Sequence, residues 1–133
     1  MMSLQNFLNK KNVVAVVGAS TNPKKWGYKV YRALKKNGFK VYPVNPKHDK
    51  IEDDKCYLSL ESLPKKPDLV ITVVPPSVTE SVVRECKMLG IKMVWMQPGS
   101  ESQEAIKFCQ ENNMRVVYNA CFVMDGLKET FGD

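Results

Sequence analysis

A turn between an apolar run and a helical pattern carries the residues of this sequence best suited to chemistry. Gly18-Ala19-Ser20 follows the run Val13–Val17, and the loop that continues from Thr21 contains two lysines. Backbone N–H groups in such a turn, the N-terminus of the following helix and a lysine charge all favour a phosphate group. We therefore interpret this turn as a phosphate-binding loop.

The loop departs from the usual dinucleotide fingerprint, which needs glycines at G-x-G-x-x-G. Ser20 and Pro23 stand at its second and third glycine positions, Lys24 and Lys25 follow, and the next glycine is Gly27. The loop is longer and more basic than the fingerprint. This difference indicates a phosphate compound other than an ordinary nicotinamide dinucleotide.

The end of the second expected strand distinguishes between phosphate compounds. An NAD site needs an Asp or Glu there for the adenosine ribose, but Pro43, Asn45 and Lys47 occupy this stretch, and the first carboxylate is Asp49. A lysine near the ribose suits an additional phosphate, which NADP carries on the 2′ oxygen and coenzyme A on the 3′ oxygen. NAD is thus disfavoured, and both other ligands stay open at this point.

The third expected strand leads directly into two prolines, Pro75 and Pro76. Proline cannot continue a hydrogen-bonded ladder, so the chain must turn here. Val74, Pro75 and Val78 then form an apolar ledge, which suits an extended apolar arm better than a stacked nicotinamide.

Apolar runs and helical patterns alternate, which predicts βαβ units and an open parallel sheet. The expected strands are Asn12–Val17, Phe39–Val44, Asp68–Val74, Lys92–Met96 and Arg115–Tyr118. The first expected helix is Ser3–Leu8, which packs on the sheet from outside, and the second is Trp26–Asn37, which ends at Gly38. A third helix is expected from a Ser77-x-x-Glu80 capping box to Gly90, and a fourth begins at a Ser100-x-x-Gln103 capping box. The connection 46–67 reads as irregular, with one short element around Leu58–Leu63. We expect an α/β, Rossmann-like, doubly wound five-stranded parallel sheet of order 3-2-1-4-5 with helices on both faces.

Ligands of such sheets bind beyond the carboxyl ends of the strands. Gln97 and Gly99 after the fourth strand and Cys121 after the fifth therefore share an edge with the phosphate loop. The Cys121 thiol could meet a ligand thiol there and form a mixed disulfide. Alternatively, Cys121 is a small buried residue at the end of the fifth strand, with no role in binding.

Composition limits the class of protein. The chain has 133 residues, 44% of them hydrophobic, and a net charge of +6, which predicts one domain over residues 1–133. The apolar runs are too short for a membrane span and the first residues lack a signal-peptide pattern, so we expect a cytoplasmic protein without a membrane partner. The lysines suit an anionic partner but are spread along the chain without a nucleic-acid-binding motif, so no nucleic acid is expected.

No residues are predicted to be catalytic. The four cysteines form no C-x-x-C pair and His48 is the only histidine, which argues against a metal site and favours reduced thiols. His48 lacks an evident orienting partner, and Ser20 lacks a histidine base in a recognisable triad. We expect binding without enzymatic activity.

The motifs Val16-Val17-Gly18-Ala19-Ser20, Pro43-Val44-Asn45-Pro46, Val73-Val74-Pro75 and Trp95-Met96-Gln97-Pro98-Gly99 together carry a resemblance. The chain resembles the small CoA-binding Rossmann-like proteins, which are similar to the N-terminal domain of the succinyl-CoA synthetase α-subunit. The resemblance implies a domain that holds coenzyme A through its diphosphate, adenosine and pantetheine parts. The synthetase chemistry depends on a phosphorylated histidine in a second domain, for which this chain is too short.

By position, the resemblance assigns four groups of residues. The diphosphate would lie against Gly18, Ala19, Ser20 and Thr21, with Lys25 nearby. The adenosine and its 3′-phosphate would be flanked by Pro43, Asn45 and Lys47. The pantetheine path would be lined by Val74, Pro75 and Val78, and the thiol would lie toward Gln97 and Gly99. The tail departs from the family pattern of a carboxylate and a basic residue after the cysteine, and Asp125 could substitute for that carboxylate.

Non-catalytic binding of coenzyme A or an acyl-CoA is thus the leading hypothesis. The alternatives are an NADP-binding oxidoreductase-like domain, which would need an absent substrate domain, and a nucleotide-sensing regulatory protein. The sequence leaves the acyl group and the oligomeric state open, with a homodimer as one possible assembly.

Overall fold

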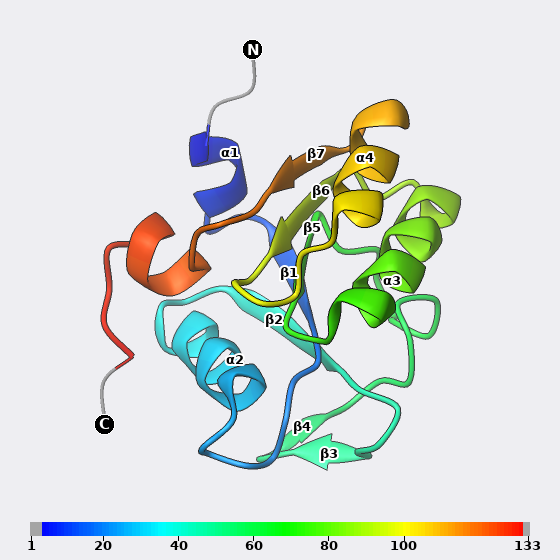
Figure 1. The fold of residues 1–133 in the computed structure, drawn as a ribbon. Helices are drawn as coiled ribbons and strands as arrows, with labels where there is room; N and C mark the ends of the chain where they lie inside the picture. The colour runs from blue at the N-terminus through cyan, green and yellow to red at the C-terminus, as the bar shows by residue number, and fades with distance from the viewer. Residues whose placement is uncertain (1–3, 132–133) are drawn as a thin grey trace.

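The computed structural model describes residues 4–131 and consists of a parallel sheet between two layers of helices (Figure 1). The strands of this sheet are β1 (Val13–Val17), β2 (Lys40–Val44), β5 (Leu69–Thr72), β6 (Met93–Met96) and β7 (Arg115–Val117). All neighbouring pairs run parallel. The predicted doubly wound, five-stranded parallel sheet is confirmed.

The strands lie side by side in the order β2-β1-β5-β6-β7. Outside β2, Tyr57 forms a single parallel bridge to Val44, and its N–H donates to the Pro43 carbonyl at 3.0 Å. If the bridge at Tyr57 is counted as strand 3 of the pattern, then β2, β1, β5 and β6 are its strands 2, 1, 4 and 5. The sheet then follows the Rossmann-like 3-2-1-4-5 order, and β7 lies beyond β6. The strand at 69–72, which the sequence analysis counted as third, therefore occupies the fourth position, on the side of β1 away from β2.

Helices cover both faces of the sheet (Figure 1). On one face lie α1 (Leu4–Leu8), α2 (Trp26–Lys36) and the π-helix η1 (Phe122–Gly126), and on the other lie α3 (Pro76–Leu89) and α4 (Gln103–Glu111). Successive strand residues alternate between the two cores: Val14 and Val16 belong to the first, Ala15 and Val17 to the second. Because both faces are covered, β1 is buried along its whole length, which explains its unbroken apolar run.

Trp95 joins the elements of the first core. Its ring contacts the rings of Phe7 and Phe122 edge-on, with centroids 5.8 and 5.0 Å away, and its indole N–H donates to the Ala120 carbonyl at 2.8 Å. Phe7 thereby packs α1 against the sheet, as predicted. Ser3, the expected first residue of this helix, lies outside the described residues.

Two predicted capping boxes are wrong. The helix α3 begins at Pro76, whose fixed φ and missing N–H suit a first helical position, so Ser77 is already inside the helix. At α4 the cap is Ser102, whose hydroxyl accepts from the Ala105 N–H at 2.9 Å. Ser100 is instead committed to the sheet, since its hydroxyl lies 2.8 Å from that of Thr72.

The connection 46–67 contains a hairpin that the sequence analysis missed. Its strands β3 (Lys50–Ile51) and β4 (Asp54–Lys55) pair antiparallel, whereas residues 58–63 form turns and bends instead of the expected element. None of the helices in the described part of the chain is long and apolar enough to cross a membrane.

The hairpin is tied to α2 by polar bonds. The Tyr31 hydroxyl and the Lys35 ammonium both donate to Asp54, and Arg32 forms a 2.9 Å ion pair with Glu52. Burial alone would raise the pKa of Asp54, but the bonds from Lys35 and Tyr31 outweigh it and lower this pKa. Burial and the Asp54 bond together raise the pKa of Tyr31. The tyrosine therefore stays neutral and donates to the carboxylate.

Replacing Tyr31 by Phe tests this tie, because the buried ring stays and only the hydroxyl is lost. Asp54 then loses a donor, and we expect the free energy of unfolding in urea to fall by about 1–2 kcal/mol. Tyr28→Phe removes an exposed hydroxyl that binds Glu52 in the same hairpin, and its cost should stay below about 0.5 kcal/mol. Equal costs for the two variants would contradict the structural role of Tyr31.

Candidate functional site

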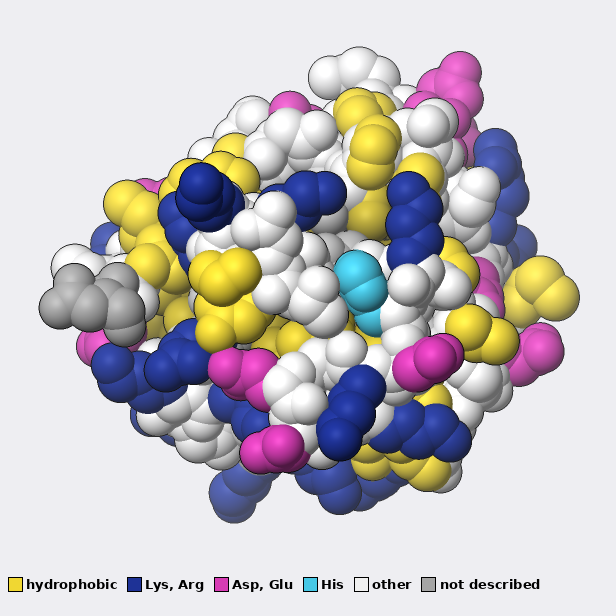
Figure 2. Space-filling view, turned by 90° about the horizontal axis from the view of Figure 1, so that it is seen from below, with side chains coloured by type: hydrophobic (Ala, Val, Ile, Leu, Met, Phe, Trp, Pro, Cys, Tyr) yellow, Lys and Arg dark blue, Asp and Glu magenta, His cyan; other side chains and the backbone are white. Residues whose placement is uncertain are grey.

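A cavity of about 1000 Å³ opens at the carboxyl ends of β1, β2, β5 and β6. Figure 2 looks onto the molecule from below Figure 1, the direction in which these strands point, and shows lysine or arginine side chains interleaved with hydrophobic ones. Most of the residues predicted for the site line this cavity, namely Gly18, Ser20, Lys25, Asn45, Lys47, Val74, Pro75, Val78, Gln97 and Gly99. The edge predicted from strand order therefore carries this cavity.

Three of the predicted residues do not line the cavity. Ala19 is fully buried in the core beneath the loop, Pro43 is buried within β2, and Thr21 is exposed at the outer side of the loop. These side chains shape the loops around the cavity. They do not form its wall.

The turn after β1 can be built only with glycine. Gly18 has φ +102°, and a Cβ there would lie 2.2 Å from the Val73 carbonyl oxygen at the end of β5. A Cβ on Gly27, in the first turn of α2, would lie 1.9 Å from the carbonyl oxygen of Gly18. Gly27 thus supplies the close packing between helix and strand that the fingerprint assigns to its third glycine.

The unpaired backbone N–H groups of this loop are suited to binding an anion. The N–H of Gly18 donates to the Val44 carbonyl at 2.9 Å, but those of Ala19, Ser20 and Thr21 meet no acceptor within residues 4–131. The helix α2 adds the positive end of its dipole, since its N-cap residue Lys25 makes no side-chain cap and its first turn has no acidic residue. Such donors are suited to a phosphate.

The charge of the cavity wall is positive. Lys24 and Lys25 come from the loop after β1, and Lys47 comes with His48 from the loop after β2. No Asp or Glu lines the cavity, and none of these lysines forms an ion pair in the described part of the chain. The absence of a carboxylate after β2, which the sequence analysis used against NAD, is thus a property of the cavity itself.

Asn45 connects the two loops. Its side-chain Nδ2 donates to the Ala19 carbonyl at 2.9 Å, and its Oδ1 accepts from the Lys47 N–H at 2.9 Å. The same side chain that lines the cavity therefore fixes the distance between the phosphate loop and the loop that carries Lys47.

The apolar wall has two sides. Val74, Pro75 and Val78 form the predicted ledge at the start of α3. Opposite it lie Trp26 and Met124, which the sequence analysis missed and which are 54% and 52% exposed. For Trp26 the sequence contained a signal of a binding role, because a large aromatic residue stands at the first position of the helix that follows the phosphate loop. The tail of the sequence gave none for Met124, because no helix was expected there.

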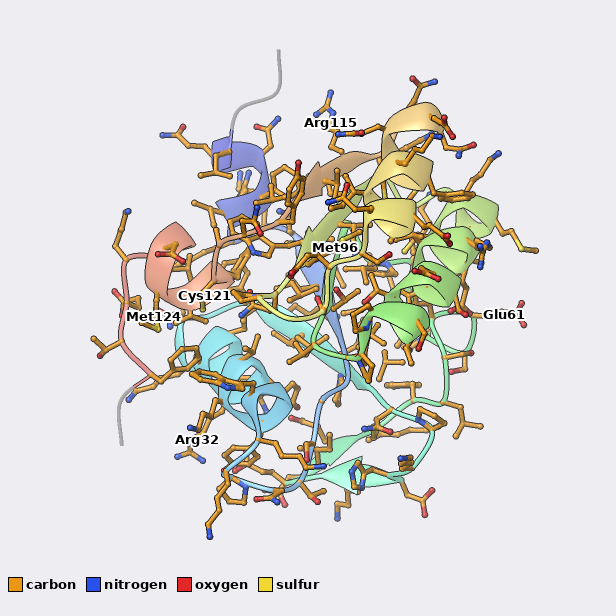
Figure 3. All side chains as sticks on the ribbon, in the orientation of Figure 1. Arg32, Glu61, Met96, Arg115, Cys121 and Met124 are labelled. Carbon is orange, nitrogen blue, oxygen red and sulfur yellow. The ribbon has the colours of Figure 1, made fainter. Side chains whose placement is uncertain are left out.

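The Gln97 side chain closes the other end of the cavity. Its Nε2 donates to the Cys121 sulfur at 3.3 Å and its Oε1 accepts from the Phe122 N–H at 2.7 Å. The N–H of Cys121 donates to Asp125 at 2.7 Å, which identifies a structural partner for that carboxylate. Figure 3 shows Cys121 at the start of η1 and Met124 within it, near the end of β6 and above α2. Cys121 lines the cavity, as its place in the sequence predicted.

The remaining reactive groups do not assemble a catalytic centre in the described residues. No three His, Cys, Asp or Glu side chains are grouped to hold a metal ion there. All four cysteines are free and buried, and burial raises the pKa of Cys109 to about 11 and that of Cys86 further. Ser20 accepts a hydrogen bond from the Asn22 N–H at 3.0 Å, and no hydrogen bond joins it to His48 in the described residues.

A family model described as "CoA binding domain" matches residues 12–126 of this chain. Among curated proteins, the chain is similar to the "Acetate--CoA ligase [ADP-forming] II subunit alpha" of Pyrococcus furiosus, with 33% identity over 129 residues. This match covers 89% of the chain but only 28% of the ligase subunit.

Two solved structures share the fold over most of their length. A conserved hypothetical protein from Pyrococcus furiosus is 42% identical with a TM-score of 0.79, covering 82% of this chain and 94% of the other. A hypothetical protein from Pyrococcus horikoshii OT3 is 32% identical with a TM-score of 0.89, covering 94% of this chain and 88% of the other.

Substituting Gly18 by Ala tests the geometry of the turn. The added methyl group meets the Val73 backbone, so we expect the free energy of unfolding to fall by about 3 kcal/mol or more. Gly38→Ala is the matched control, since Gly38 also has a positive φ, of +87°, but a Cβ there has open space. Its cost should be about 1 kcal/mol, the strain of φ alone. Equal costs in urea denaturation would show that the contact with β5 is not tight.

Proposed function

Because this chain belongs to the CoA binding domain family, we propose that it binds coenzyme A or an acyl-CoA and catalyses no reaction itself. The observation that carries the proposal is the cavity, whose basic end combines three lysines with unpaired backbone donors and no carboxylate. Its volume of about 1000 Å³ is at the upper end of the range for small-molecule and cofactor sites, as an extended cofactor requires.

The ligand would extend along the carboxyl ends of the strands. The diphosphate would lie on the N–H groups of Ala19 and Ser20, next to Lys25 and the N-terminus of α2. Lys47 would face the 3′-phosphate of the adenosine. The pantetheine arm would run along the ledge of Val74, Pro75 and Val78 toward Gln97 and Gly99. In this arrangement each chemical part of coenzyme A meets a wall of matching polarity.

The absence of catalysis is part of the proposal. The chain spans 28% of the length of the ligase subunit that it matches, and the described residues contain no paired nucleophile and base. The proposed binding domain comprises residues 1–133, and a cytoplasmic location suits such a ligand. Ligase chemistry would need groups that another domain or protein supplies.

Titration calorimetry with coenzyme A, dephospho-CoA, NADP and NAD tests the ligand. We expect coenzyme A to bind most tightly, and dephospho-CoA about fivefold or more weakly, because it lacks the phosphate that Lys47 faces. Measurable binding of NADP alone would contradict the proposal and favour the oxidoreductase-like alternative.

The Lys47→Gln variant tests the role assigned to this lysine. We expect it to weaken coenzyme A by about fivefold and to leave dephospho-CoA within about twofold, since only the former carries the 3′-phosphate. Lys40→Gln removes an exposed charge at the opposite end of β2 and should change neither affinity. Equal losses for both ligands in Lys47→Gln would place the 3′-phosphate elsewhere.

A further inference from the structure

The two ends of the cavity differ in what their backbone offers to a ligand. At the loop after β1, three consecutive N–H groups meet no acceptor in residues 4–131. At the loops after β6 and β7, most N–H groups of the cavity-lining residues are already used. That of Gly99 donates to Glu101 at 2.9 Å and that of Cys121 to Asp125 at 2.7 Å.

Most other donors at this second end are used as well. The N–H of Phe122 is taken by the Gln97 side chain at 2.7 Å, and those of Gln97 and Ser100 are taken by backbone carbonyls at 3.0 and 2.9 Å. Pro98 has no N–H. Of the cavity-lining residues at this end, only Met124 keeps an N–H without an acceptor in residues 4–131.

The charges differ in the same way. All lysines of the cavity wall come from the loops after β1 and β2, whereas Gln97, Pro98, Gly99, Ser100, Cys121 and Met124 at the second end are uncharged. The carboxylates of Glu101 and Asp125 lie directly behind Gly99 and Cys121, and neither forms an ion pair in the described part of the chain. The lysine charges of the site thus lie at one end of the cavity, whereas two carboxylates without an ion pair lie next to the other end.

On this basis, and resting on the proposed function, we propose that the site selects among acyl-CoA thioesters by charge. It accepts free coenzyme A and thioesters of neutral acyl groups, and it disfavours thioesters whose acyl group ends in a carboxylate. Such a carboxylate would lose water against Met124 and Cys121 with a single unpaired backbone N–H in reach, and it would lie near the charges of Glu101 and Asp125. One unpaired N–H falls short of the paired donors of an oxyanion hole, which agrees with binding without catalysis.

Butyryl-CoA and succinyl-CoA form a matched pair, because their acyl groups have the same number of carbon atoms and differ mainly in a terminal methyl or carboxylate. In titration calorimetry at low salt, we expect butyryl-CoA within about threefold of coenzyme A and succinyl-CoA about tenfold or more weaker than butyryl-CoA. Higher ionic strength should narrow this ratio.

The double variant Glu101→Gln, Asp125→Asn removes both charges and keeps an oxygen to accept from Gly99 and Cys121. We expect the ratio of the two affinities to fall by about fivefold or more in this variant, with coenzyme A little changed. Glu61→Gln is the charge-matched control, since Glu61 points outward on the far side of the molecule from η1, and it should leave the ratio unchanged (Figure 3).

Equal binding of the two thioesters by a protein that binds coenzyme A would overturn charge selection and leave the proposed function standing. An unchanged ratio in the double variant would do the same. Failure of coenzyme A itself to bind would overturn the proposed function and the selectivity together.

Discussion

The contact of Gly18 with the end of β5 and with Gly27 is the constraint on which the candidate site depends. Because Gly18 and Gly27 have no side chains, the end of β1 packs against the Val73 carbonyl and the start of α2 packs against the Gly18 carbonyl. The helix N-terminus and the loop N–H groups are brought to one place by this double approach. Lys24 and Lys25, which lie between these two glycines in the sequence, line the cavity wall.

A second link fixes the width of the site. The Asn45 side chain joins the loops after β1 and β2, while Gln97 joins the ends of β6 and β7 to η1. Each amide uses its nitrogen and its oxygen within the protein. These two amide side chains are therefore part of the frame of the site, and the lysine charges left over for a ligand lie at one end only.

Sequence reasoning was most successful where periodicity and strand order decide the structure. The buried run 13–17, the helix from Trp26 and the edge shared by Gly18, Asn45, Pro75 and Gln97 all follow from the physics of a parallel sheet covered on both faces. It failed where a single side chain has two competing partners. Ser77 and Ser100 both read as helix caps, but the backbone preference of Pro76 and the hydroxyl of Thr72 decide otherwise.

The parts missed altogether depend on contacts between distant segments. The hairpin 50–55 has little pattern of its own and is held by Tyr31 and Lys35 on α2. The position of η1 is set by Trp95 on β6 and by Gln97 directly after it, so the place of Met124 could not be read from its neighbours in the sequence.

The placement of the two tryptophans gives the protein a built-in optical probe. Trp95 is buried at the centre of one core, while Trp26 stands half exposed on the cavity wall, between Lys29 at 4.7 Å and the ring of Phe131 at 5.2 Å. The emission of Trp95 reports on whether the core is intact. That of Trp26 reports on what occupies the cavity, so folding and occupancy can be followed in one unlabelled sample by the separate wavelengths of a dry and a wet indole.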